Sequence, residues 1–192
     1  MQRKYLILVV LATLSIVLDQ VTKFWIRDNL PEGAYPITVI PDFFRIIHAE
    51  NPGAAWGIFR DAHWRIPFFV VTTVLAFGII GSYFRRLAHN DYLQAVALSL
   101  ILGGAVGNFI DRIMFKSVTD FLEFYVGWEP TATWFIQNLR SNRWPAFNVA
   151  DISIVVGIGL ALYHIFFIEP RLEKEAAAAA AASAEGASGG NT

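Results

Sequence analysis

Four apolar blocks, separated by polar segments, limit what this chain can fold into. The blocks cover residues 5–26, 66–84, 92–110 and 147–168. Each is close to the roughly 20 residues that a helix needs to cross about 30 Å of hydrocarbon. Hydrophobic residues make up 55% of the chain and charged residues only 16%. We therefore expect a membrane protein with four transmembrane helices.

The charge pattern predicts how these helices are oriented. Four spans put both termini on the same side of the membrane, and basic residues flank the short elements of that side, which suits a cytoplasmic location. These residues are Arg3, Lys4, Arg85, Arg86, Arg171 and Lys174. The first block imitates a signal peptide, but charged residues follow it without a small-x-small cleavage site. We expect a retained helix that also serves as the targeting signal.

The polar segments contain weaker signals of regular structure. Residues 35–40 and 43–47 have a strand-like composition, and residues 118–126 alternate as an extended segment does. We expect a small extracytoplasmic sheet on the outer face of the bilayer, with a short interfacial helix from about Thr133 to Leu139. The fold class is thus a mainly α membrane protein. Residues 1–172 are expected to form the membrane domain, and 173–192 an alanine-rich tail of low complexity.

Two aspartates stand at the edges of the apolar blocks: Asp120 in the extended segment and Asp151 where the fourth block begins. A carboxylate in such a place is costly unless a partner or a task retains it. If the two share a water, repulsion and burial let the pair hold one proton, so that one acts as a base and the other as an acid. Alternatively, Asp120 is an ordinary loop acid and Asp151 complements the dipole of the fourth helix.

Other reaction classes have little support in the sequence. The chain has no cysteine, which excludes a thiol nucleophile and thiolate metal sites. Its four histidines show no metal-ligand spacing, and no serine-nucleophile motif or phosphate-binding glycine loop is present. We predict neither a metal nor a cofactor. The net charge of −1 gives no reason to expect a nucleic-acid partner.

Two pairs of polar residues lie four apart, one within the first apolar block and one at the end of the third. Asn108 and Arg112 share a helix face, where the arginine offers donors to a carboxylate, carbonyl or phosphate, or extends to the lipid headgroups with Asn108 as its partner. Asp19 and Lys23 have the spacing of an ion pair within one helix.

Small residues mark two further places. Gly103 and Gly107 fit the small-xxx-small pattern that lets membrane helices pack closely. Residues 51–57 begin with a turn former, and either cap the sheet or clamp a ligand through the amide of Asn51.

Five motifs, in order and spanning nearly the whole chain except its tail, together closely resemble those of the lipoprotein signal peptidases, also called signal peptidase II. They are Asp19-Gln20-Val21-Thr22-Lys23, Asn51-Pro52-Gly53-Ala54-Ala55-Trp56-Gly57, Gly103-Gly104-Ala105-Val106-Gly107-Asn108 with Asp111-Arg112, Val118-Thr119-Asp120-Phe121, and Phe147-Asn148-Val149-Ala150-Asp151. One such motif would be weak evidence, whereas five in order are very specific.

The resemblance implies an aspartyl endopeptidase of the bacterial inner membrane, with both termini cytoplasmic and the active site towards the periplasm. Its substrates would be diacylglyceryl-modified prolipoproteins, cleaved just before the lipidated cysteine, and its other partners membrane lipids. We expect a monomer. Motif matching makes Asp120 and Asp151 the catalytic pair. It also implies a set of substrate-binding or supporting residues: Asn51, Gly104, Asn108, Arg112, Asn148, Asp19 and Lys23.

One segment departs from the family's pattern. Residues 127–144 make the connection between the two catalytic motifs longer than the family usually has it. A longer loop outside the packed elements need not move the aspartates. We expect it to affect which substrates enter or to gate the site, with Trp134 and Trp144 at the membrane interface.

Two other classes of protein fit parts of the sequence. A small proton-coupled transporter would use the acids as a relay near the bilayer midplane, whereas here both acids lie at the block edges. A non-catalytic membrane scaffold would tolerate the loss of either acid.

Overall fold

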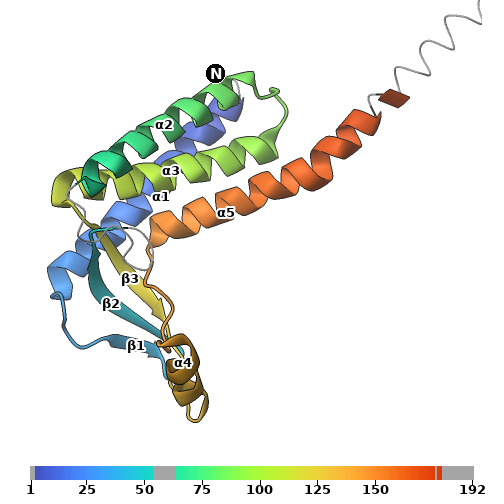
Figure 1. Ribbon diagram of the computed structural model, residues 1–192. Helices are drawn as coiled ribbons and strands as arrows, with labels where there is room; N and C mark the ends of the chain where they lie inside the picture. Colours follow the sequence, from blue (N-terminus) through green and yellow to red (C-terminus); the bar gives the residue numbers. More distant parts are fainter. Residues whose placement is uncertain (1–2, 54–63, 176, 179–192) are drawn as a thin grey trace, which may run out of the picture.

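Four long helices form a bundle with a small sheet at one end (Figure 1). The computed structural model describes residues 3–53, 64–175 and 177–178. Its long helices are α1 (Arg3–Asn29), α2 (Arg65–Arg86), α3 (Tyr92–Phe115) and α5 (Val149–Tyr163), the last of which continues through a π-helical turn, η2 (His164–Ile168), and further helix to Glu175. All four are long and apolar enough to cross a membrane. The predicted fold class and its four spans are confirmed.

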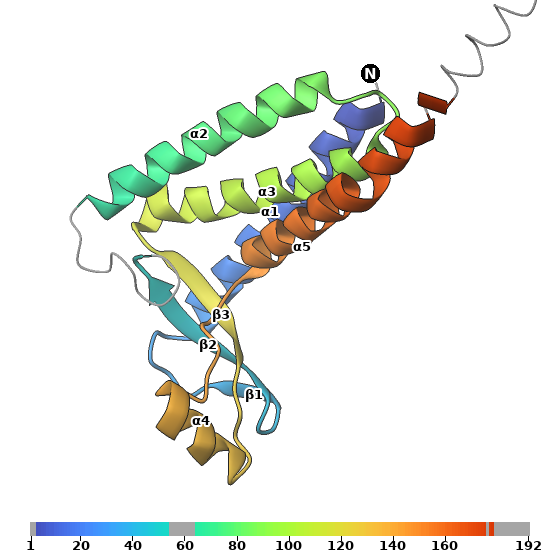
Figure 2. The same ribbon diagram turned by 45° about the vertical axis from the view of Figure 1, so that its right-hand side comes forward.

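Helix α3 is the centre of the bundle, packing against α1 and α5 and also against α2. Small residues make this possible. A Cβ added to Gly103 would lie 2.7 Å from the Cβ of Ser15 in α1, and one added to Gly104 would collide with the backbone oxygen of Ala150 in α5. The packing interpretation of the glycine pattern is confirmed. Figure 2 shows α2 set apart from α5, with α3 between them.

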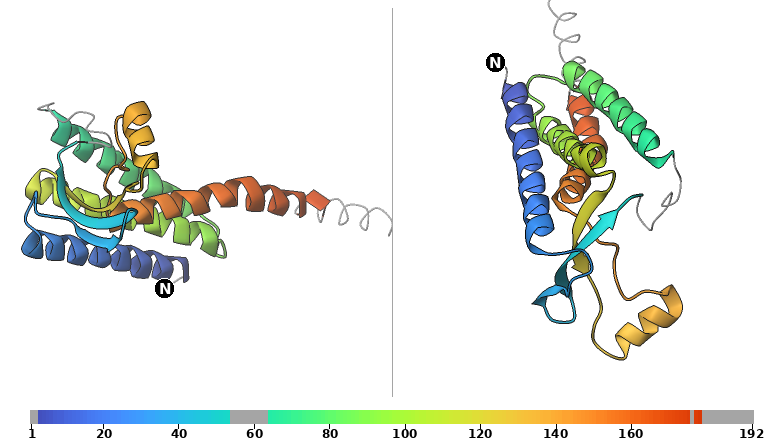
Figure 3. Two further views of the ribbon diagram at one scale, coloured as in Figure 1. Left: turned by 90° about the horizontal axis from the view of Figure 1, so that it is seen from below. Right: turned by 90° about the vertical axis from the view of Figure 1, so that its left-hand side faces the viewer.

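The sheet has three antiparallel strands in the order β1 (Ile37–Ile40), β2 (Phe44–Asn51) and β3 (Val118–Phe124). Its register pairs Ala49 with Asp120 and Asn51 with Val118. Because residues two apart on a strand share a face, Asn51 is a diagonal neighbour of Asp120. The short helix α4 (Thr131–Leu139) follows β3. The sheet and the short helix were both predicted. They extend from one end of the bundle and to one side of it (Figure 3).

The opposite end of the bundle holds the N-terminus, the connection from α2 to α3 and the end of α5 (Figure 1). Two contacts join these elements. The buried Lys4 ammonium donates to the backbone oxygen of Leu87 at 2.5 Å, where a cation suits the C-terminus of α2. The imidazole Nε2 of His164 lies 2.9 Å from a carboxylate oxygen of Asp91. The start of the first span and the end of the fourth are thus on the same side.

Part of the sequence-based expectations fall outside the described residues. They concern residues 54–57 of the motif that begins at Asn51, and residues 176 and 179–192 of the tail.

Candidate active site

Asp120 and Asp151 line a single cleft of about 980 Å³ between the sheet, α3, α4 and α5. They share this cleft because the segment before α5 runs along β3. The backbone N–H groups of Phe121 and Leu122 both donate to the carbonyl of Phe147, at 3.0 and 2.9 Å, and Phe147 N–H donates back to Leu122 at 3.0 Å. This pairing fixes the first turn of α5 beside the strand that carries Asp120.

Asp151 caps its own helix and also faces the cleft. Its backbone N–H donates to the side-chain oxygen of Asn148 at 3.0 Å, and its carboxylate accepts from Asn148 N–H at 3.2 Å, which is a capping box. The other carboxylate oxygen accepts from the Asn108 amide at 2.8 Å. The helix-dipole interpretation from the sequence and a role in the cleft are therefore compatible.

Asp120 is not an ordinary loop acid, because it lies within β3 with only 4% of its surface exposed. One carboxylate oxygen accepts from the Asn51 amide at 2.9 Å, and the other from the Asn148 amide at 2.7 Å. Burial raises the pKa of Asp120 to about 7, and the charge of Asp151 acts in the same direction, whereas the two amides oppose it.

Asn108 and Asn148 connect the two carboxyl groups. Asn148 is fully buried, and its amide also donates to the side-chain oxygen of Asn108 at 3.2 Å. That oxygen accepts in addition from the ammonium of Lys23 at 2.9 Å. Because an ammonium can only donate, the Asn108 atom beside it must be the oxygen, and the amide nitrogen is left to face Asp151. Lys23 thus determines how Asn108 presents itself to the cleft.

Lys23 belongs to a buried group of charges behind the cleft. It pairs with Asp19 at 2.8 Å and with Asp111 at 3.1 Å, and all three side chains are fully buried. Asp111 also pairs with Arg27 at 2.8 Å, and Asp19 accepts from the backbone N–H of Ala150 in the first turn of α5 at 2.9 Å. The ion pair predicted between Asp19 and Lys23 is confirmed.

Sequence reasoning did not single out Asp111 and Arg27 as members of this group. A signal for them was present. Asp19, Lys23 and Arg27 are spaced four apart and so form a charged stripe along one face of α1, inside a membrane span. Such a stripe requires an acidic partner on a neighbouring helix. Asp111 is an acid within the α3 motif.

The remaining predicted residues lie around this centre. Arg112 lines the cleft together with both aspartates, donates to the backbone oxygen of Asn108 at 3.2 Å, and stacks its guanidinium 4.5 Å above the ring of Phe69. Gly104 faces the backbone of α5 at Ala150 rather than the cleft. Its role is to let α3 approach the helix that carries Asp151.

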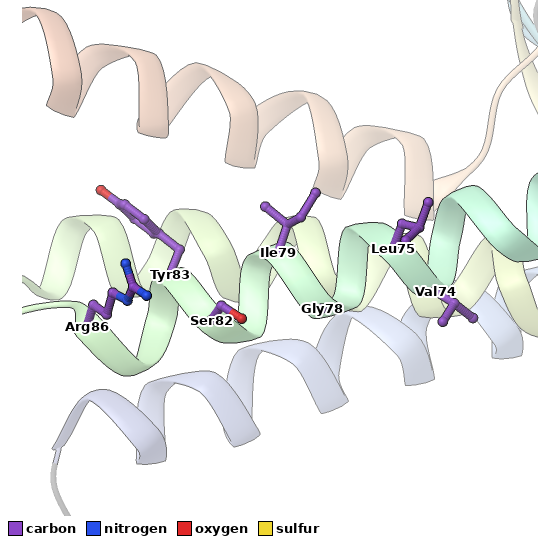
Figure 4. A pocket seen from close by; sticks show the side chains of 7 residues that line it. All are labelled: Val74, Leu75, Gly78, Ile79, Ser82, Tyr83 and Arg86. Carbon is purple, nitrogen blue, oxygen red and sulfur yellow. The ribbon is translucent and has the colours of Figure 1, made fainter.

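A second cavity, of about 520 Å³, lies along α2 (Figure 4). Its side chains Leu75, Ile79 and Tyr83 point towards α5 (Figure 4). The lining is apolar or weakly polar apart from Arg86. The described lining of this cavity contains no carboxyl group, in contrast to that of the cleft beside the sheet.

Comparison with known proteins agrees with this geometry. The family model described as signal peptidase (SPase) II matches residues 11–167. The chain is 42% identical to the lipoprotein signal peptidase of Maridesulfovibrio salexigens over 80% of its length and 91% of the relative's. It is 38% identical to that of Geobacter metallireducens, covering 91% of this chain and 99% of the relative.

A solved bacterial membrane enzyme, determined by the in meso method at 1.9 Å, has a TM-score of 0.69 and 30% sequence identity, covering 84% of this chain and 93% of its own. The match of most of the chain to one family, together with these relatives and this shared fold, leads to one conclusion. The chain belongs to the signal peptidase II family and is a protease.

Proposed function

We propose that this protein is an aspartyl endopeptidase of the bacterial inner membrane that removes the signal peptide from diacylglyceryl-modified prolipoproteins, cutting just before the lipidated cysteine. The relatives named lipoprotein signal peptidases support the substrate class. The observation that carries the mechanism is that Asp120 and Asp151 line the same cleft, each held by asparagine amides.

The two carboxyl groups divide the work in this mechanism. Burial favours the neutral form of Asp120, whose pKa is raised to about 7, so it carries the proton. Asp151 lies in the first turn of α5, where a helix accommodates negative charge, and serves as the base. As Asp151 takes a proton from the attacking water, the water oxygen forms a bond to the scissile carbonyl carbon, and Asp120 polarises that carbonyl. The C–N bond of the resulting tetrahedral intermediate then breaks as Asp120 donates its proton to the leaving amine.

The surrounding residues hold this pair in place and position the substrate. Asn51, Asn108 and Asn148 orient the carboxyl groups, and Arg112 offers donors to a substrate carbonyl from the wall of the cleft. The buried charges of Asp19 and Lys23 support Asn108 and the first turn of α5 from behind.

The proposed topology has both termini in the cytoplasm and the sheet in the periplasm. It is supported by the basic residues Arg85 and Arg86, which end α2 at the same end of the bundle as the N-terminus. The cleft lies at the other end, beside the sheet. A monomer that receives its lipidated substrate laterally from the bilayer fits this arrangement. A transporter would instead need its acids near the midplane.

The substrate assignment is tested with two synthetic peptides and the purified protein in bilayers. Both contain a signal sequence and the residues that follow it, but only one has a diacylglyceryl group on its cysteine. We expect cleavage of the lipidated peptide alone, with product masses that locate the cut on the amino side of the cysteine. Failure of the well-folded protein to cleave several lipidated peptides, together with proton flux across sealed vesicles, would favour the transporter.

The pH dependence of kcat/KM is a second test. We expect kcat/KM to fall as the pH rises above about 7, because Asp120 then loses the proton that it must supply. The fall should approach tenfold per pH unit, as expected for the loss of one proton. A rate that stays constant from about pH 6 to about pH 9 would contradict the assignment of the acid to Asp120.

A further inference from the structure

The cleft that contains the aspartates extends well beyond them, as far as α4. At that distant end its lining includes Phe135 and Leu139 of α4, and Arg143 and Trp144 of the segment that follows. The cavity is large enough for a ligand of considerable size, not only for the few atoms that react.

The apolar groups at this end are only partly covered by the protein. Leu139 and Trp144 are each 62% exposed, although both line the cleft. Ile136 is also exposed, at 50%, but it is not part of the cleft lining. A ligand in the cleft would cover Leu139 and Trp144 and leave the solvent exposure of Ile136 unchanged.

The return segment that follows α4 is hydrogen-bonded to the end of β3 and to the residues just after it. Trp144 N–H donates to the carbonyl of Phe124 at 2.9 Å, and Val126 N–H donates to that of Asn142 at 2.8 Å. These bonds continue along β3 to the pairing of Phe147 with Leu122. The return segment is therefore held against β3 at Trp144 and again at Phe147, just before the first turn of α5.

The sheet provides an aromatic floor beside the wall that α4 and the return segment form. The ring of Phe124 lies 5.1 Å from that of Phe43 and is stacked on that of Phe147 at 5.8 Å, and all three residues line the cleft. The space between floor and wall is thus apolar on two sides, with the guanidinium of Arg143 among its lining groups.

We propose that α4 and the return segment bind the acyl chains of the lipidated cysteine where they leave the glyceryl group. The inference rests on the proposed function. When the scissile bond is at the aspartates, the first methylene groups of both chains are drawn towards the end of the bundle and out of the hydrocarbon. Leu139, Trp144 and the aromatic floor keep those methylenes from water, and Arg143 offers donors to the ester carbonyls.

Each methylene kept from water is worth about fourfold in affinity, from the free energy of burying one CH₂. The advantage applies only to the part of the chain that has left the bilayer, since lipid tails are themselves apolar. The residues 127–144 would then select the lipid of the substrate rather than its peptide sequence.

The test compares Leu139→Gln with Ile136→Gln, a matched change on the same helix outside the cleft. Both variants and the parent are assayed in bilayers on two peptides whose glyceryl group carries either two palmitoyl or two acetyl chains. The esters are kept and only the methylenes differ. We expect the ratio of kcat/KM for the palmitoyl peptide to kcat/KM for the acetyl peptide to fall roughly tenfold in Leu139→Gln. In Ile136→Gln this ratio should stay at the parent's value.

Two results would overturn the proposal while the parent still cleaves both peptides. If the two variants lose the preference for long chains equally, α4 contacts the membrane rather than the acyl chains. If kcat/KM of Leu139→Gln falls by the same factor for both lipids, the wall contacts the peptide. Neither result would affect the proposed reaction, whereas a parent that cleaves neither peptide would remove the reaction itself.

A second measurement does not depend on turnover or on the stability of the α4 variants. The inactive Asp151→Asn protein is incubated with a lipidated peptide that has a photoreactive group on the first carbons of an acyl chain. After irradiation, we expect the adduct within residues 135–147. Labelling confined to the membrane-facing sides of α1 and α2 would contradict the proposal.

Discussion

Replacing either Asp120 or Asp151 with asparagine is expected to lower kcat for prolipoprotein cleavage by about 10²- to 10⁴-fold, the range that general acid–base groups contribute. Asparagine has nearly the shape of aspartate, but it can neither take a proton from water nor supply one to the leaving amine. Because each member of the pair has one of these tasks, both single variants should be inactive. The double variant should be little worse than either.

A matched control separates chemistry from charge and folding. Asp28 is an exposed acid in the last turn of α1, outside the cleft lining, so Asp28→Asn should keep the parent's rate. The two inactive variants should still insert into the membrane and bind the lipidated peptide with an affinity near that of the parent. Substantial activity in either purified variant would show that the pair does not carry the reaction.

The second large effect is expected from Lys23→Met. The change would leave Asp19 and part of Asp111 without a cation in a fully buried place, where Lys23 now lies 2.8 and 3.1 Å from them. Removing one partner of a buried ion pair costs about 3–5 kcal/mol. The free energy of unfolding of the purified protein, measured by denaturant titration, should fall by this amount.

Two further variants test the cause of that loss. Lys174→Met, at an exposed position near the end of the helix that continues α5 to Glu175, should leave the free energy of unfolding unchanged. Combining Lys23→Met with Asp19→Asn should recover part of the stability, because it removes one of the unpaired charges. A Lys23→Met protein as stable as the parent would mean that the buried charges do not depend on the lysine.

The four spans could be predicted because the thickness of the bilayer sets the length of an apolar helix. The residues at which the helices begin and end were less predictable. Helix α3 continues five residues beyond the apolar block that ends at 110, to Phe115, since Asp111 is paired inside the protein and does not need to leave the membrane. Helix α5 begins at Val149 instead of 147, because the backbone of Phe147 is engaged with β3.

The candidate site was predictable to the extent that its parts lie within motifs. Asp120 and Asp151 could be named as a pair because both are acids at block edges, and Asp19 and Lys23 because their spacing is helical. The contacts between motifs could not be derived in this way. That Lys23 orients Asn108, and that Asn148 reaches both Asp120 and Asn108, depends on how three helices and a strand pack.

The acyl-chain contact proposed for residues 127–144 could not be derived from the sequence alone. The composition predicted a short helix, and α4 is there, beginning two residues before the expected start. That Leu139 and Trp144 line the same cavity as the aspartates could be seen only in the structure, where the return segment pairs with β3.

The most direct test of the central claim is single-turnover cleavage of a diacylglyceryl peptide in bilayers, with the protein in saturating excess over the substrate. This condition removes differences in binding and product release, so the rate reports the chemical step. The parent should release the signal fragment in a single phase, and Asp120→Asn and Asp151→Asn should release none on the same time scale. Comparable single-turnover rates in the parent and either variant would contradict an aspartate pair that activates the water.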